Sequence, residues 1–401
     1  SKLSAWLAVA MLLIYSAAWV FPMTGETPQA AQGALVRTLY LPAYGLGLLL
    51  FLSAPVNTVR AVVRQPFLVA MMVVAALSVF WSIAPDQTAR RVFAIVCTTG
   101  GSLVLAARFS WEELAEAAAA CFAVLAVTAL VAALAFPQIG VMHELFPGAW
   151  RGTWPEKNAL GGAMALGFTC LAAAAVLNPQ RRWLWWGFAG LALFLVIMST
   201  SKTSLLALML GAGGIVFVGL MRRGPVAQVA MVWAAVLGLT IIAGTVIFAA
   251  DAVFDLLGKD STLTGRTEIW SAALHQIEKR PLTGFGYGVI WDVKGTWTPF
   301  AWIEREAGFT PQHAHNSWLE QWLGLGIFGL AAFALFYLQT FALTAVALFR
   351  HPGAYLAAPF LLVYSLMTLT ESIAFTYNDL RWVLFAAIAA RLALPVDGAA
   401  R

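Results

Sequence analysis

Charged side chains are scarce in this sequence of 401 residues. Asp, Glu, Lys and Arg together make up 11% of it, whereas soluble domains contain about 25%. Hydrophobic residues account for 61%, and the mean hydropathy is +0.81. The formal charge of +5 is small for this length and is spread over many loops. These values exclude an ordinary soluble domain, give no sign of a nucleic-acid partner, and indicate an integral membrane protein.

Cysteine is also rare. Cys97, Cys121 and Cys170 all lie in apolar segments, where a thiol usually acts as a small core residue. We therefore expect neither a disulfide framework nor a zinc framework. Segments of about ten residues with alternating hydrophobicity, typical of membrane barrels, are missing as well. The membrane-crossing elements should therefore be helices.

Twelve apolar runs have roughly the length that a helix needs to cross about 30 Å of hydrocarbon. We predict an all-α polytopic membrane protein with about 12 transmembrane helices, at residues 4–22, 38–55, 66–84, 91–108, 114–136, 159–178, 183–199, 203–221, 227–250, 321–349, 354–372 and 381–396. The first run should be an uncleaved helix. The tenth run is too long for one straight crossing, and its Gly324, Gly326 and Gly329 predict either a break or a helix that enters from the membrane surface.

The spacing of these runs divides the chain into three parts. Nine helices would occupy 1–250, a large polar loop 251–320, and three more helices 321–401. With a cytoplasmic N-terminus, the inner segments hold eleven Lys and Arg residues and the short outer loops hold seven. This is the direction of the positive-inside rule, so we expect both termini in the cytoplasm and the large loop outside.

With this topology, the polar clusters of unusual composition all lie on the outer face. They are residues 81–91, 150–158, 199–204, 251–320 and 371–381. Basic residues are disfavoured on that face. Their presence there predicts an anionic ligand.

The large loop ends in His313-Ala314-His315-Asn316, with Glu320 at the start of the next helix. A neutral imidazole at His315 could take a proton from a sugar hydroxyl, because its pKa lies near the working pH. Two other interpretations are open: a histidine that only forms hydrogen bonds at the membrane surface, and a metal-binding pair, for which no third ligand stands at close spacing. We predict His315 as the general base and no metal. His313 would either orient His315 or bind the acceptor.

Arg266 opens an amphipathic helix that ends before Pro281. Its apolar face consists of Ile269, Trp270, Ala273, Leu274 and Ile277. Such a helix would lie along the outer surface with its apolar side down. A cation at the positive end of a helix dipole is unfavourable unless an anion binds there. The alternative is an ion pair of Arg266 with Glu268 or Glu304.

Further cations stand in the other outer clusters. Lys202 lies in a run of hydroxyls, Ser199 to Ser204, which suits a phosphate, although snorkelling to headgroups is an alternative. The adjacent Arg90 and Arg91 could grip a diphosphate or lipid headgroups. We predict that Lys202, Arg90, Arg91 and Arg266 bind a diphosphate.

Other polar residues of these clusters are candidates for substrate binding: His313, Asn316, Arg151, Lys157, Asn158 and Tyr287. Tyr287 belongs to the glycine-rich stretch 283–288, which is not a dinucleotide fingerprint because no strand precedes it. Tryptophans of the outer loops, among them Trp291, Trp297 and Trp302, could stack on sugar rings, although anchoring at the membrane surface explains most of them.

These motifs together resemble the O-antigen ligase and polymerase family of bacterial envelope proteins. The resemblance is carried by Gly265 to Trp270, by Pro281 to Gly288 and by His313 to Leu319, with weaker matches in 154–162 and 199–204. The family usually has His where this chain has Glu156, so Glu156 receives no role. It usually has Arg where this chain has Lys202, which keeps the charge but loses the bidentate fork.

The resemblance implies a fold of the glycosyltransferase C type in the bacterial inner membrane, with a periplasmic active site and no cofactor. It implies an O-antigen ligase that moves a glycan from undecaprenyl diphosphate to the lipid A core oligosaccharide. Arg266, Lys202, Arg90 and Arg91 would stabilise the diphosphate leaving group, and His315 would deprotonate the acceptor, with inversion at the anomeric carbon. The partners would be undecaprenyl-diphosphate-linked O-antigen, lipid A core and membrane lipids.

Two alternatives are open. An O-antigen or exopolysaccharide polymerase, or a protein O-glycosylating enzyme, of the same family would differ only in the acceptor. A twelve-helix transporter or lipid flippase would place charged residues near the bilayer midplane and show two similar halves. Residues 1–200 and 201–401 share no such pattern, and the ionisable residues gather at one face. This distribution favours an enzyme.

Overall fold

The computed structural model describes residues 2–27, 33–248 and 265–395. These residues form helices and, outside one isolated bridge between Val141 and Trp150, no β structure. The α-helices are α1 (Lys2–Tyr15), α2 (Val20–Thr24), α3 (Ala34–Ser53), α4 (Pro55–Val63), α5 (Pro66–Leu77), α6 (Pro85–Arg108), α7 (Trp111–Ala135), α8 (Pro137–Gly140), α9 (Lys157–Leu177), α10 (Arg182–Met198), α11 (Lys202–Met221), α12 (Pro225–Phe248), α14 (Arg266–Lys279), α15 (Pro299–Ala307), α16 (Ser317–Arg350), α17 (Ala354–Thr370) and α18 (Leu380–Ala393).

Each of the twelve apolar runs coincides with a helix, and this confirms an all-helical membrane protein. Seven of the described helices are long and apolar enough to cross a membrane, and an eighth span results if α4 and the helix that follows it, bent by 85°, count as one. Helices α1 and α17, and the part of α12 from Pro225 to Ile241, are apolar but shorter. The ends of the runs predicted to stop at residues 250 and 396, and the predicted boundary between 250 and 251, lie outside the described residues.

Small residues allow the helices to pack closely around α9. An added Cβ at Gly211 would lie 2.3 Å from Thr169 Oγ1, and one at Gly167 would lie 2.8 Å from Phe122 Cδ1. Small side chains at helix contacts are the usual means of association in membranes, where the surrounding lipid is as apolar as the side chains. The alanine-rich sequences of α7 and α9 serve this close approach.

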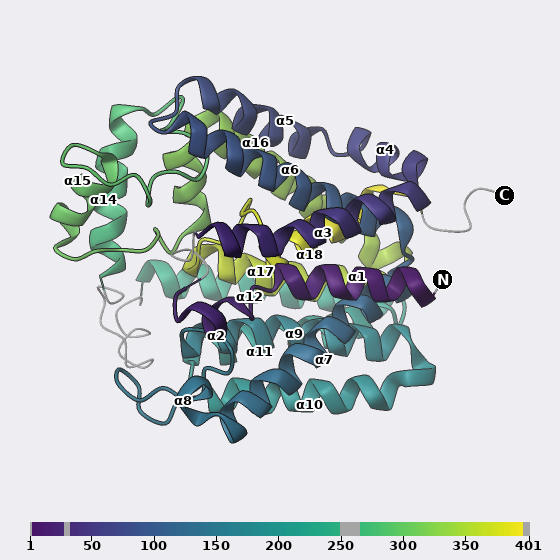
Figure 1. Ribbon diagram of the computed structural model, residues 1–401. Coiled ribbons are helices and arrows are strands. Elements are labelled where there is room, and N and C mark those ends of the chain that lie inside the picture. The colour runs from purple at the N-terminus through teal and green to yellow at the C-terminus, as the bar shows by residue number, and fades with distance from the viewer. Residues whose placement is uncertain (1, 28–32, 249–264, 396–401) are drawn as a thin grey trace.

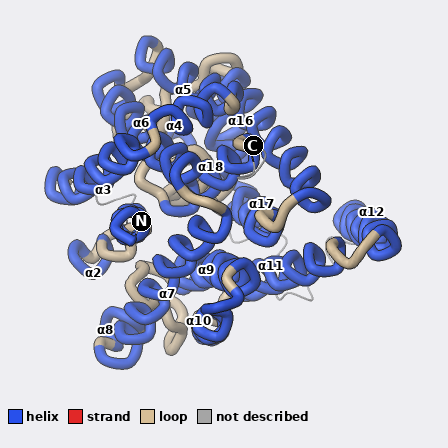
Figure 2. The backbone as a smooth tube through the Cα atoms, turned by 90° about the vertical axis from the view of Figure 1, so that its right-hand side faces the viewer, coloured by secondary structure: helices blue, strands red, loops and turns tan. Residues whose placement is uncertain are grey.

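The helices form two groups, shown in Figure 1. Helices α3 to α6 and α16 lie on one side of α17 and α18, and α7, α9, α10 and α11 lie on the other. Helix α12 stands apart from both groups (Figure 2), with Trp233 and Leu239 largely exposed. An exposed apolar helix in such a protein is suited to lipid contact.

Helices α14 and α15 lie together at one end of the bundle, and α1 starts at the opposite end (Figure 1). As predicted, α14 begins at Arg266 and buries Ile269, Ala273 and Ile277, although Leu274 is 41% exposed. The helix runs across the ends of the bundle helices (Figure 1). It therefore forms a wall beyond the apolar bundle.

The predicted break in α16 is confirmed at Gly326, where φ is 67°. A Cβ at this position would lie 2.1 Å from the Leu282 carbonyl oxygen, so only glycine fits. The neighbouring loop satisfies the backbone groups that the break releases: Phe285 N–H donates to Leu323 O (3.1 Å), and Ile327 N–H donates to Pro281 O (2.9 Å). Broken helices in membrane proteins depend on such partners.

Candidate active site

One cavity of about 1860 Å³ collects side chains from all five polar clusters. Its wall includes Arg90 from α6, Lys157 from α9, Lys202 from α11, Arg266 from α14 and His315. These residues are far apart in the sequence. This arrangement is consistent with the prediction that the polar clusters share one face.

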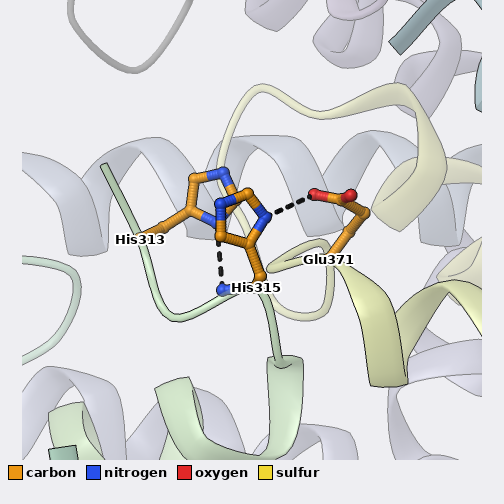
Figure 3. A group of neighbouring side chains, drawn as sticks. All are labelled: His313, His315 and Glu371. Atoms are coloured by element: carbon orange, nitrogen blue, oxygen red, sulfur yellow. Dashed lines mark hydrogen bonds and ion pairs between the residues drawn. The ribbon is translucent and has the colours of Figure 1, made fainter. Parts of the chain in front are cut away.

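His315 and Glu371, which both line this cavity, face one another (Figure 3). His315 Nδ1 lies 3.2 Å from Glu371 Oε2, and both side chains are 30% exposed. Because Nδ1 faces the carboxylate, a neutral His315 with its proton on Nδ1 carries its lone pair on Nε2. A carboxylate that fixes a histidine tautomer in this way prepares the other nitrogen to accept a proton.

The backbone around the cavity is held in unusual conformations. Five non-glycine residues of the described chain have positive φ, and all five line this cavity: Ala17, Thr200, His315, Phe375 and Asn378. At His315 φ is 51°. Such a conformation costs on the order of 1 kcal/mol or more and persists only where the surroundings enforce it, commonly at functional sites.

The start of α16 positions His315. The Asn316 side chain caps the helix by accepting hydrogen bonds from the N–H groups of Trp318 (3.0 Å) and Leu319 (3.2 Å). The buried Ser317 hydroxyl donates to Glu371 O (2.8 Å) and accepts from Ile373 N–H (2.9 Å). These bonds fix the segment that carries Glu371 against the segment that carries His315.

Glu320 provides a second clamp one turn further along α16. Its carboxylate accepts hydrogen bonds from Ala314 N–H (2.7 Å), from the Ser372 hydroxyl (3.0 Å) and from the Trp291 indole (2.9 and 3.0 Å). One carboxylate thus joins the loop before α16, the loop after α17 and the loop before α15. It holds the wall of the site together.

Arg266 meets the same carboxylate as His315. Its Nη2 lies 3.4 Å from Glu371 Oε1, so neither Glu268 nor Glu304, the partners considered from the sequence, forms this contact. Burial would raise the pKa of Glu371, but the hydrogen bond from His315 and the nearby positive charge, including that of Arg266, outweigh it and lower the pKa below its usual value. Glu371 is therefore an anion at neutral pH, shared between a base and a cation.

His313 lies beside His315, with ring centroids 3.9 Å apart (Figure 3). Its Nδ1 accepts the His315 backbone N–H at 3.2 Å. Burial, and then the charge of His315, lower the pKa of His313 to about 3. His313 is therefore neutral and orients the His315 backbone.

Of the described residues, His313, His315 and Glu371 have the composition and proximity to hold a metal ion, with one ligand atom of each within 4.8 Å of the others. Glu371 supplies the third ligand that was not visible at close spacing in the sequence. In this structure, however, Glu371 already lies against Arg266, and one nitrogen of each histidine faces a protein group. The nearby guanidinium charge disfavours a divalent cation.

Cations exceed carboxylates in the cavity wall. The cations are Arg37, Arg90, Arg91, Lys157, Lys202, Arg266, Lys294 and Arg381. The carboxylates are Glu156, Asp292, Glu320, Glu371 and Asp379. This surplus of positive charge within a cavity favours an anionic ligand.

The predicted diphosphate-binding cations differ in their surroundings. Arg90 is exposed to the cavity, and Lys202 stands at the first position of α11, after its cap Ser201. Arg91, in contrast, is buried, pairs with Asp292 at 2.6 Å and donates to Gly288 O. Its guanidinium is engaged with the protein, so a phosphate contact by Arg91 stays a prediction.

The predicted substrate-binding residues also divide. Lys157, Asn158, Tyr287 and His313 line the cavity, whereas Arg151 and Asn316 do not. Arg151 donates to Ile139 O (2.8 Å) and Gln138 O (3.1 Å) and lies over the Phe21 ring. Arg151 thus holds its own loop in place, and Asn316 caps its own helix. Contact of either residue with the substrate stays a prediction. Tyr287 donates to Phe375 O (2.7 Å), which fixes its ring in the wall.

Sequence reasoning did not single out Glu371, Ser317 or the bidentate pair of Arg381 with Asp379, which lies at 2.5 Å in the cavity wall. Glu371 stands at the end of the apolar run 354–372 and begins the polar cluster 371–381, on the face predicted to carry His315 as well. A carboxylate at the start of this outer cluster was the signal in the sequence that could have identified Glu371 as a partner of His315.

Two known groups of proteins resemble this chain. A family model described as O-antigen ligase matches residues 187–334, the part that contains Lys202, Arg266 and His315. The exopolysaccharide production protein ExoQ of Rhizobium meliloti (strain 1021) is 28% identical over 318 residues, which cover 72% of this chain and 67% of that protein. These two similarities support an O-antigen ligase-family membrane protein.

Proposed function

We propose that this protein transfers a glycan from a polyprenyl diphosphate carrier to a sugar hydroxyl of an acceptor, with His315 as the general base. The observation that carries the proposal is the bridge of Glu371 between His315 and Arg266, within one cavity that has a surplus of cations. The proposed base and the proposed phosphate-binding cation share one carboxylate, which supports transfer from a diphosphate.

In the proposed step, the acceptor oxygen attacks the anomeric carbon on the face opposite the diphosphate. The bond from this carbon to the diphosphate oxygen breaks, and its electron pair leaves with the diphosphate. The acceptor proton passes to His315 Nε2, and the resulting imidazolium is stabilised by Glu371. The configuration at the carbon is inverted.

Arg266, Lys202 and Arg90 would stabilise the negative charge of the leaving diphosphate. Each well-placed cation contributes a few kcal/mol where water is excluded. Lys202 would act as a point charge rather than a fork. We further place the site on the periplasmic face of the inner membrane and the fold in the glycosyltransferase C type, as the membrane helices and the family support.

The lipid A core oligosaccharide is the first candidate acceptor, supported by the family description as O-antigen ligase. The second candidate is a growing exopolysaccharide chain, favoured by the match to a protein of exopolysaccharide production over most of this chain. Both acceptors offer a sugar hydroxyl, so the same residues would serve either one.

A competition between acceptors separates the two candidates. Purified wild-type protein receives undecaprenyl-diphosphate-linked glycan together with rough lipopolysaccharide. Ligase activity predicts a ladder of extended lipopolysaccharide. Polymerase activity predicts lengthening of the lipid-linked glycan while the lipopolysaccharide is unchanged. Neither product from folded protein, with the glycan units that the native host makes, would contradict the proposed transfer.

A further inference from the structure

An exposed cluster of aromatic and basic side chains lies around α15, outside the cavity; two of its members are on α15, one precedes that helix and one ends α14. It consists of Trp297, Trp302, Lys279 and Arg305, which we name the α15 platform. The two indoles lie with ring centroids 6.0 Å apart. Lys279 Nζ lies 5.0 Å from the Trp302 ring, and the Arg305 guanidinium lies 5.1 Å from Trp302 and 5.9 Å from Trp297. None of the four lines the cavity.

Helix α15 connects this platform to the active site. The Thr298 hydroxyl caps the helix by accepting Ala301 N–H, and Phe300 and Ile303 are buried beneath it. Phe300 also lines the cavity, as do Phe309 to His313 immediately after the helix. One face of this short helix therefore belongs to the cavity wall, while the platform occupies another.

The rings are exposed and yet held in place. Trp297 is 77% exposed and Trp302 38%. Arg305 donates to Thr296 O (2.8 Å), and Lys279 donates to Gln276 Oε1 (3.0 Å), so both cations are fixed beside the indoles. Exposed indoles that are held by cations form a rigid, amphipathic surface, which binds a ligand at little cost in side-chain entropy.

The position of α15 argues against lipid as the ligand. In Figure 1, α15 is the outermost element at its end of the molecule, beyond α14 and away from the ends of the bundle helices. An indole that anchors a protein at the membrane surface belongs nearer to the apolar helices. Flat rings with adjacent cations instead suit sugar rings that carry acidic groups.

We propose that the α15 platform binds a polysaccharide with carboxylate substituents, by stacking of pyranose rings on Trp297 and Trp302 and by charge pairing with Arg305 and Lys279. It would hold a part of the glycan distant from the reacting sugar. The class of ligand rests on the proposed glycan transfer. The binding itself requires no turnover, so the two proposals can fail separately.

The test measures binding of oligogalacturonate, with a neutral malto-oligosaccharide of equal length for comparison, to the purified protein in lipid nanodiscs by saturation-transfer NMR. We expect the acidic probe to bind wild type more tightly than the neutral one. Trp297→Ala should weaken binding of the acidic probe about tenfold. Arg305→Gln should weaken it several-fold at low salt and by less at high salt.

Trp183→Ala is the matched control. Trp183 is 75% exposed and also carries an arginine over its ring, Arg182 at 4.9 Å, but it lies on α10. Its replacement should leave binding unchanged. Equal weakening in Trp183→Ala, unchanged binding in Trp297→Ala, or preference for the neutral probe would overturn the proposal.

A second measurement tests the lipid alternative directly. Nanodiscs with brominated acyl chains quench indoles at the membrane surface. The difference in fluorescence between wild type and Trp297→Ala should be insensitive to bromination. Strong quenching of the Trp297 signal would make the platform a membrane anchor and refute the proposal. If the protein transfers glycan but does not bind the acidic probe, the platform proposal is refuted and the proposed function stands. If it binds the probe but does not transfer glycan, only the proposed function is refuted.

Discussion

At the scale of single residues, the site depends on one carboxylate with two partners. Glu371 lies 3.2 Å from His315 Nδ1 and 3.4 Å from Arg266 Nη2. It can fix the histidine tautomer, stabilise the imidazolium after proton transfer and hold Arg266 near the leaving group. None of these roles requires Glu371 to touch the substrate, so it is a positioning residue.

Replacing Glu371 with Gln should therefore lower kcat and leave KM nearly unchanged. We expect a fall in kcat of about 10²-fold, the lower range for general base catalysis. Steady-state transfer kinetics with purified protein measure both constants. Glu156→Gln is the matched control, because Glu156 also lines the cavity but has no assigned role; its kcat should stay within about threefold. A large rise in KM with unchanged kcat in Glu371→Gln would assign Glu371 to substrate binding instead.

His313 makes stability depend on pH. Its pKa is about 3 in the folded protein and about 6.5 in an unfolded chain. Below pH 6.5 the unfolded chain binds a proton that the folded protein does not, so stability falls as the pH falls, by up to about 1.4 kcal/mol per pH unit. Between pH 7 and pH 5 the thermal midpoint of wild type should drop more than that of His313→Gln. Equal drops in both would show that His313 is protonated in the folded state.

At the scale of elements, the broken helix α16 connects the bundle to the site. Its first turn carries Ser317 and Glu320, which clamp the loops on either side, and its break at Gly326 receives the loop 281–288. The site is thus built on the end of a membrane helix rather than on a free loop. A rigid support of this kind keeps catalytic groups in register.

Gly326→Ala should disturb the break. The new Cβ would meet the Leu282 carbonyl oxygen at 2.1 Å, at a positive φ that alanine disfavours. We expect a loss of about 2 kcal/mol or more in stability, seen as a lower thermal midpoint, together with reduced transfer. Gly190→Ala in α10, where a Cβ meets nothing within 4 Å, should be neutral. A neutral Gly326→Ala would mean that the break is not needed.

At the scale of the whole molecule, the hydrophobic runs predicted where the helices lie, but not how many of them are long enough to cross the membrane. The run at 4–22 becomes a helix of 14 residues, because a turn with positive φ at Ala17 interrupts the apolar stretch. The run at 354–372 becomes a helix of 17 residues that ends where the backbone becomes extended at Glu371. Polar clusters predicted His315, Arg266 and Lys202 in one cavity. Glu371 was missed because its contact with His315 joins residues 56 positions apart. Substrate binding by Arg151 and Asn316 stays a prediction, and in this structure local backbone groups hold both side chains.

The central claim is that His315 removes the acceptor proton while Arg266 stabilises the leaving diphosphate, without a metal ion. The most direct measurement is single-turnover transfer from undecaprenyl-diphosphate-linked glycan by wild type, His315→Ala and Arg266→Ala, each with chelator and with donor binding measured separately. We predict that wild type is indifferent to the chelator. His315→Ala should bind donor normally but transfer at least about 10²-fold more slowly, and Arg266→Ala should lose both donor affinity and rate. Transfer at the wild-type rate by folded His315→Ala, or loss of wild-type activity on chelation that added metal restores, would contradict this account.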